Sequence, residues 1–134
     1  MSQREQYLLD THALIFWEGQ HSVSNEFVIF LDELAKQGSL FVSSISFWET
    51  ALLIQKNRLS ISDVHTWKDG ILANTGLRLL NPSATEMINS VQLPNHHKDP
   101  FDRLLIAQAQ ANNLILITRD NAIEQYDIET FWMQ

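Results

Sequence analysis

The chain contains no cysteine, which excludes a disulfide scaffold and a thiolate metal site. It also lacks any run of about 18 apolar residues, the length that a membrane-spanning helix needs. The segment from Met1 to Glu5 does not have the long apolar stretch of a signal peptide. We therefore expect a soluble cytoplasmic protein, in a reducing compartment and without membrane association.

Positive charge is also scarce. Nine Lys and Arg residues against 16 Asp and Glu residues give a formal net charge of −7. This balance argues against a broad basic face for binding nucleic acid, although it leaves room for a nuclease that approaches phosphate through metal ions. The proportions of hydrophobic (45%) and charged (19%) residues are ordinary for a globular protein and exclude disorder.

Glycine and proline are few and scattered, so no linker or low-complexity stretch divides the chain. Its 134 residues are typical of one domain, and we predict a single domain over residues 1–134. Apolar runs suited to strands alternate with segments of helical period, which predicts an α/β fold with a mostly parallel sheet. The expected strands are 7–9, 40–42, 77–80, 114–117 and 128–131. The expected helices are 24–37, 46–58, 63–75, a short one opening at 81–83, 99–112 and a short one at 121–126.

Acidic residues follow several of the expected strands. Asp10 comes directly after the first strand, Glu49 falls in the first turn of the helix after the second, and Asp120 follows the strand 114–117. The carboxyl ends of parallel strands share one edge of the sheet, where ligands usually bind. Asp99 and Asp102 open the helix before 114–117, and they join this edge if that helix starts there, as short connections require.

Gathering these carboxylates is electrostatically unfavourable. Two like charges 4 Å apart repel by roughly 4 kcal/mol at an effective dielectric of about 20, and a helix N-terminus offsets only about 0.3–1 kcal/mol. A divalent cation offsets far more, and oxygen ligands favour Mg²⁺ or Mn²⁺. Such an ion could activate water for attack on a phosphodiester.

Helix capping is the alternative explanation for each acid. Ser46 and Glu49 have the S-x-x-E spacing of a capping box, so Glu49 could be only its partner. Ser83 and Glu86 have the same spacing, and there we predict capping alone.

The other acids have the same alternative. Asp99 before Pro100 is a good N-cap with Asp102 at the N3 position, and Asp10 and Asp120 could cap the helices that follow them. Taken singly the acids favour capping, whereas their convergence on one edge favours a metal site.

Several other polar residues surround the acids. His96 and His97 lack the i, i+4 spacing of a zinc pair, so we expect a solvated loop there. Lys98, Arg103 and Arg119 could contact phosphate or could pair with the acids. For the tryptophans we favour core or interface packing over stacking on bases; they are Trp17, Trp48, Trp67 and Trp132.

Four segments together resemble the motifs of PIN-domain nucleases. They are 7–14 (YLLDTHAL), 42–49 (VSSISFWE), 99–109 (DPFDRLLIAQA) and 116–120 (LITRD). Their order and spacing cover almost the whole chain and most resemble the small VapC-like toxins of bacterial type II toxin–antitoxin systems.

The resemblance implies a three-layer αβα fold and a Mg²⁺- or Mn²⁺-dependent endoribonuclease that acts on RNA. It also implies a homodimer and inhibition by a cognate antitoxin. Asp10, Glu49, Asp102 and Asp120 match the family's four acidic positions and would hold the metal. Asp99 is an additional acid of the D-P-F-D variant and is included among the catalytic candidates.

Two other functions are compatible with parts of the sequence. A catalytically silent PIN-like module would act by protein interaction, but the intact set of acids argues against it. A phosphoaspartyl receiver domain needs a lysine at a strand end opposite the acids, whereas Lys98 is expected in a loop.

Overall fold

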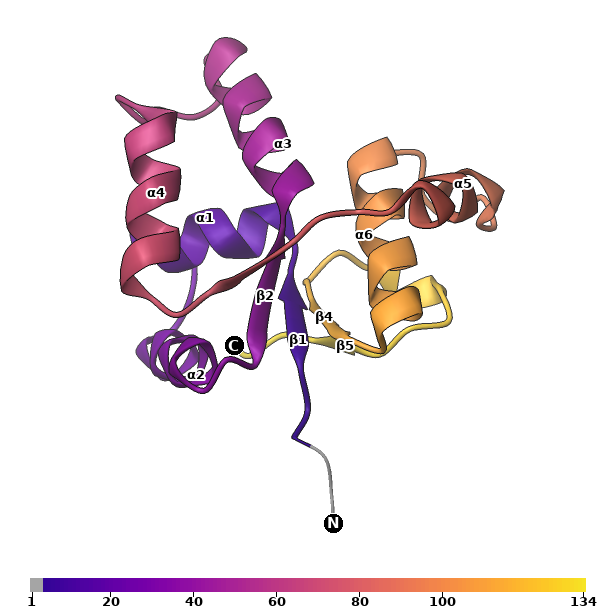
Figure 1. The fold of residues 1–134 in the computed structure, drawn as a ribbon, viewed down its shortest axis with the longest axis horizontal. Helices are drawn as coiled ribbons and strands as arrows, with labels where there is room; N and C mark the ends of the chain where they lie inside the picture. Colours follow the sequence, from indigo (N-terminus) through magenta and orange to yellow (C-terminus); the bar gives the residue numbers. More distant parts are fainter. Residues whose placement is uncertain (1–3) are drawn as a thin grey trace.

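The computed structural model describes residues 4–134, so the first three residues of the predicted domain lie outside the described residues. One parallel sheet runs through this part of the chain in the order β3-β2-β1-β4-β5 (Figure 1). Its strands are β1 (Tyr7–Leu9), β2 (Leu40–Ser43), β3 (Arg78–Leu80), β4 (Ile115–Ile117) and β5 (Thr130–Phe131). The helices are α1 (Thr11–Gly19), α2 (Asn25–Lys36), α3 (Ser44–Gln55), α4 (Val64–Asn74), α5 (Ala84–Gln92) and α6 (Pro100–Asn112), with a 3-10 helix η1 (Ile123–Gln125). The predicted α/β class is confirmed.

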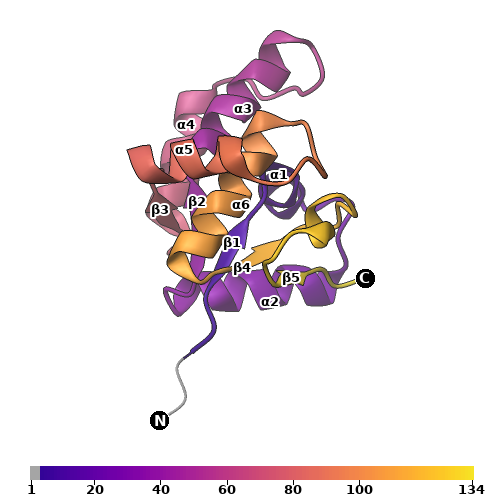
Figure 2. The ribbon, with the colours of Figure 1, turned by 90° about the vertical axis from the view of Figure 1, so that its right-hand side faces the viewer.

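Helices cover both faces of the sheet because successive strand side chains point to opposite sides. Leu9 and Val42 belong to a core shared with α1, α2 and α4. Leu8 and Leu116 belong to a second core, shared mainly with α6. Figures 1 and 2 show these two groups of helices on either side of the strands. The architecture is therefore the three-layer αβα arrangement that the resemblance implied.

Helix α1 has no counterpart among the helices expected from the sequence. Ala13, Leu14, Ile15 and Trp17 are all buried, so the helix is apolar on more than one side. A helix of this kind shows no amphipathic stripe for a pattern of period 3.6 to detect. The side chain of Asp10 caps it, as the capping alternative anticipated.

Helix α3 begins at Ser44, two residues before the expected start. Ser43 is its N-cap, with a side-chain oxygen that accepts the N–H of Ile45 at 3.3 Å. Glu49, expected in the first turn, therefore lies beyond it, and the capping box considered as an alternative for Ser46 and Glu49 does not form. The buried hydroxyl of Ser46 instead accepts a hydrogen bond from Thr11 at 3.0 Å.

The capping box at the start of α5 is confirmed. Glu86 N–H donates to Ser83 Oγ at 3.1 Å, and Ser83 N–H donates to Glu86 Oε1 at 2.9 Å.

The C-terminal elements are shorter than expected. Residues 121–126 form only the 3-10 helix η1, and the last strand contains only two residues. Asp120 explains the first difference, because its Oδ1 accepts the N–H of Ala122 at 2.9 Å and closes a local turn in place of a helical one. Within residues 4–134 there is no helix with the length and apolar character needed to span a membrane.

Candidate metal centre

Asp10 lies at the middle of the carboxyl edge, since it follows the central strand β1. Its Oδ1 accepts the N–H of Ala13 at 2.7 Å, and the residue is only 7% exposed. Burial raises the pKa of Asp10, while hydrogen bonds from the Thr118 hydroxyl and from Ala13 partly oppose that rise. Asp10 is thus both a helix cap and a buried acid.

Glu49 reaches the same region from α3 and is also buried. Desolvation raises the pKa of Glu49 and the charge of Asp99 adds to the rise, while the nearby Thr11 hydroxyl lowers it. Its Oε1 is buried and has no hydrogen-bond partner among residues 4–134. Leaving a buried polar atom unsatisfied costs free energy, so this oxygen requires a cation, a proton or a water.

Helix α6 starts at this edge and supplies two acids. Asp99 is its N-cap, with Oδ1 accepting the N–H groups of Phe101 at 2.8 Å and Asp102 at 3.3 Å. The capping role predicted for Asp99 is confirmed, with Pro100 in the first turn. Burial raises the pKa of Asp102 to about 7, and the charges of nearby acids, first Asp99, contribute to the rise.

Asp120 comes after β4 and is the last of the acids that were predicted at this edge of the sheet. Asp10, Asp102 and Asp120 line one pocket of about 280 Å³ together with His12, Phe16 and Arg119. The structure therefore places these three acids in one pocket, with Glu49 and Asp99 close enough to Asp102 to raise its pKa.

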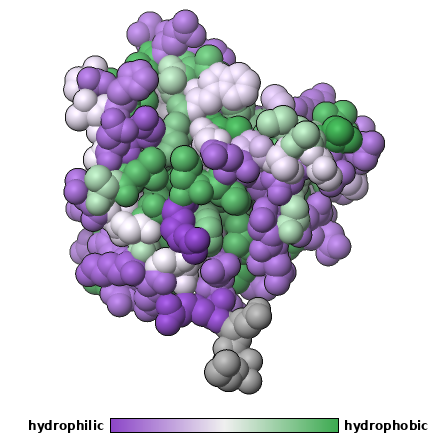
Figure 3. Space-filling view, in the orientation of Figure 1, coloured by the Kyte–Doolittle hydropathy of each residue, from purple (hydrophilic) through white to green (hydrophobic). Residues whose placement is uncertain are grey.

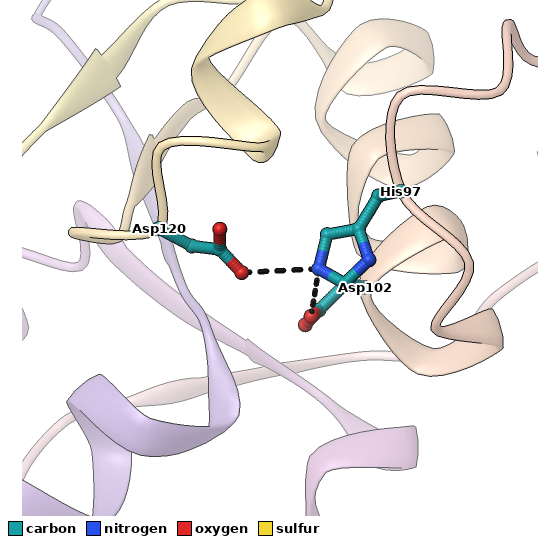
Figure 4. A group of neighbouring side chains, drawn as sticks. All are labelled: His97, Asp102 and Asp120. Carbon is teal, nitrogen blue, oxygen red and sulfur yellow. Dashed lines mark hydrogen bonds and ion pairs between the residues drawn. The ribbon is translucent and has the colours of Figure 1, made fainter.

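A histidine that the sequence placed in a solvated loop lies among these acids. His97 Nε2 is 2.9 Å from Asp102 Oδ2 and 3.0 Å from Asp120 Oδ2 (Figure 4). Only His96, the neighbouring histidine, is exposed as expected. The i, i+4 spacing of metal-binding histidines on a helix could not reveal this contact, because the path of the loop before α6 brings His97 to the acids.

Arg103 neither pairs with the acids nor faces a phosphate site. Its guanidinium is buried and donates only to neutral groups. The acceptors are the main-chain carbonyls of Ser90, Val91, Leu93, Pro94 and His97 and the hydroxyl of Tyr126. Arg103 therefore fixes the connection from α5 to α6, on which His97 lies.

Arg119 and Lys98 are exposed. The Arg119 guanidinium lies over the rings of Phe16, at 4.8 Å, and Trp132, at 5.4 Å, on the rim of the acidic pocket. Trp48 is 61% exposed and contacts Phe101, so it does not pack in the core, while the expected interface packing stays a prediction.

The comparisons show to which family this parallel αβα domain, with acids gathered at the carboxyl edge of its sheet, belongs. The family model for the PIN domain matches residues 7–129. The chain belongs to the PIN domain family. No significant match was found among curated proteins.

Solved structures share the fold. VapBC2 from Rickettsia felis, bound to a DNA fragment from its promoter, aligns with a TM-score of 0.71 at 19% identity, over 93% of this chain and 96% of that one. DNA-bound VapBC from Salmonella typhimurium gives a TM-score of 0.69 at 15% identity, over 96% and 98% of the two chains. FitAcB from Neisseria gonorrhoeae gives 0.63 at 22% identity, over 94% and 96%.

Proposed function

We propose that this protein is a metal-dependent endoribonuclease and the toxin of a type II toxin–antitoxin pair. It would cut RNA phosphodiester bonds with metal-activated water. The observation that carries the proposal is the gathering of buried carboxylates with raised pKa values at the carboxyl edge of a PIN-domain sheet. Perturbed acids of this kind concentrate at functional sites.

The residues fit Mg²⁺ or Mn²⁺. The donors offered by Asp10, Glu49, Asp102 and Asp120 are all carboxylate oxygens, which these ions prefer. The buried Glu49 Oε1 has no partner among the described residues, and burial, together with like charge, raises the pKa values of Asp10, Glu49 and Asp102. A bound cation would give Glu49 Oε1 a partner and would offset the like charge of the acids.

Each surrounding residue has a role in this proposal. The bound ion would supply a water of lowered pKa and positive charge beside the phosphate. Asp99 fixes the first turn of α6, from which Asp102 reaches the pocket. Arg119, held over Phe16 and Trp132 at the rim, would contact a phosphate of the RNA.

A ribonuclease that acts on its own host's RNA in the cytoplasm requires an inhibitor. The fold of this chain occurs in the DNA-bound VapBC structures from Rickettsia felis and Salmonella typhimurium. We propose a cognate antitoxin that inserts an arginine among the acids as a charge-assisted pair. Exposed apolar side chains offer surface for its helix or for a second copy of the chain; they are Trp48 on α3 and Met87, Ile88 and Val91 on α5. Figure 3 shows further apolar surface across the middle of one face.

Growth and cleavage assays test the proposal together. The wild-type protein, expressed alone, should arrest growth, and purified protein should cleave RNA in Mg²⁺ or Mn²⁺ but not after chelation. Asp10→Asn should do neither, and co-expression of an adjoining antitoxin gene should restore growth. If wild type and Asp10→Asn are equally harmless at equal soluble expression, the silent interaction module is the better explanation.

A further inference from the structure

The hydrogen bonds of His97 identify the position of its proton. Asp99 N–H donates to His97 Nδ1 at 3.2 Å. A backbone N–H can only donate, so Nδ1 must present its lone pair and carries no hydrogen. The ring is then neutral with its hydrogen on Nε2, the atom that faces the Oδ2 atoms of Asp102 and Asp120.

This arrangement distinguishes two roles for His97. His97, Asp102 and Asp120 place one possible ligand atom each within 4.8 Å of one another, which resembles a three-residue metal site. A metal ligand must offer a lone pair, however, and in this tautomer the only nitrogen lone pair already accepts the Asp99 N–H. Nε2 can therefore donate to the carboxylates but cannot bind the ion.

We propose that His97 is a positioning residue of the acidic site: its Nε2–H donates to Asp120 Oδ2 and lies beside Asp102 Oδ2, and so holds the two carboxylates in one orientation. The inference rests on the proposed metal site for its consequence, because fixed carboxylates bind an ion more tightly. The second oxygen of Asp120 is held independently by the N–H of Ala122 at 2.9 Å. Asp120 is thus fixed at both oxygens.

The loop is built to keep His97 in place. Tyr126 Oη accepts the N–H groups of His96 at 3.1 Å and His97 at 2.9 Å, and donates to Pro94 O at 2.6 Å. The Arg103 guanidinium binds His97 O at 3.0 Å. Two side chains from other parts of the fold therefore hold the backbone on which the imidazole is mounted, as expected for a fixed positioning group.

Imidazole ¹⁵N NMR of the metal-free protein at neutral pH reads the tautomer directly. We expect a hydrogen attached to His97 Nε2 and a bare Nδ1, and we expect the Nε2–H to persist in saturating Mg²⁺. A hydrogen on Nδ1, or replacement of the Nε2 hydrogen by a metal–nitrogen bond, would overturn the proposal.

Calorimetric titration with Mn²⁺ measures the consequence. In His97→Gln the side-chain amide keeps a donor near the position of Nε2, and affinity should stay within about threefold of wild type. His97→Asn keeps a polar atom near Nδ1 but loses the donor, and affinity should fall by about 10–100-fold, the range for groups that orient metal ligands. His96→Asn is the matched control, with no expected change, because its exposed side chain does not contact the acids.

The two measurements separate this inference from the proposed function. Equal Mn²⁺ affinity in His97→Asn and wild type would overturn the positioning role while leaving the metal site standing. Absence of Mn²⁺ binding by wild type would remove the metal site, and the imidazole spectrum would still decide whether Nε2 carries the hydrogen that the positioning role requires.

Discussion

Two buried polar clusters lie beside the first turns of α6 and are organised in opposite ways. The acid cluster (Asp10, Glu49, Asp99, Asp102 and Asp120) gathers like charges, and burial followed by repulsion raises the pKa values of Asp10, Glu49 and Asp102. The arginine anchor (Arg103 with its acceptors) surrounds one positive charge with carbonyl and hydroxyl oxygens. Asp102 and Arg103 are adjacent in the sequence, yet each belongs to a different cluster.

The contrast indicates what each cluster is for. The arginine anchor satisfies its buried charge within the protein, and it ties α5, the loop before α6 and the C-terminal region together. Among the described residues no Lys or Arg forms an ion pair with the acid cluster, and Glu49 Oε1 has no hydrogen-bond partner. We expect the first to contribute to stability and the second to cost stability in return for ligand binding.

The largest expected effect is the loss of the arginine anchor. Arg103→Met leaves buried carbonyls without their donor, each at about 1–3 kcal/mol, and water replaces some of these bonds. We expect the free energy of unfolding to fall by about 3–5 kcal/mol in urea denaturation. Arg119→Met, which removes an exposed cation–π contact, should cost less than about 1 kcal/mol. Equal losses in the two variants would contradict the contribution to stability that is assigned to the arginine anchor.

In the acid cluster we expect a substitution to raise the free energy of unfolding instead of lowering it. Asp102→Asn removes one of several like charges, so the metal-free protein should become more stable. RNA cleavage should nevertheless fall by at least about 100-fold, the scale seen when one charge-stabilising group of a site is lost. Thermal melting with and without Mg²⁺ should show a rise in Tm for wild type only. A less stable Asp102→Asn protein that cleaves RNA normally would assign Asp102 to structure.

The pH dependence of stability should report the raised pKa values. A carboxyl whose pKa is raised in the folded state stabilises the fold below its unfolded pKa, and this stability is lost as the pH rises through the folded value. For Asp102 the window runs from about 4 to about 7. We expect a fall of at least about 1–2 kcal/mol across it without metal, since each pKa unit is worth about 1.4 kcal/mol, and Asp10 and Glu49, whose pKa values burial also raises, act in the same direction.

Asp63 contributes outside this window: hydrogen bonds from Thr66 lower its pKa, so its effect on stability lies below a pH of about 4. Denaturation at a series of pH values should show the fall in wild type and a flatter profile in Asp102→Asn. Saturating Mg²⁺ should reverse the trend, because the ion binds the deprotonated acids. A wild-type protein whose stability rises steadily from pH 4 to 7 without metal would contradict the raised pKa values.

The position of the acids could be predicted because it depends on connectivity alone. Asp10 and Asp120 follow neighbouring parallel strands, and a short connection forces α6 to start at the same edge. The position of His97 could not be predicted in this way. The path of its loop depends on bonds from Arg103 and Tyr126 to main-chain atoms, and the main chain is the same for every sequence.

The start of α3 illustrates the same limit at a smaller scale. Ser43, Ser44 and Ser46 are all acceptable N-caps by residue type. Tertiary contact decides among them, because Ser46 is buried with its hydroxyl bonded to Thr11 and Ser43 is left to cap the helix. The sequence could therefore place Glu49 at the acidic edge, but it could not show in which turn of α3 Glu49 lies.

The smallest expected effect comes from Asp99, which belongs to the acid cluster by charge and to the fold by its cap. Asn caps helices about as well as Asp, so Asp99→Asn keeps the bonds to Phe101 and Asp102 and should change stability by less than about 0.5 kcal/mol. Asp99→Ala loses the cap as well and should cost about 0.5–2 kcal/mol. Comparing Asp99→Asn with Asp99→Ala separates the effect of the charge on stability from the effect of the helix cap.

The charge of Asp99 should still be visible at Asp102. Since Asp99 raises the pKa of Asp102, its neutralisation should lower the midpoint of the Asp102 carboxyl titration, followed by ¹³C NMR in the metal-free protein. RNA cleavage by Asp99→Asn should fall by less than about tenfold, because the carboxylates proposed to hold the ion remain. A loss as large as that of Asp102→Asn, with the fold intact, would make Asp99 a ligand and extend the metal site to the helix cap itself.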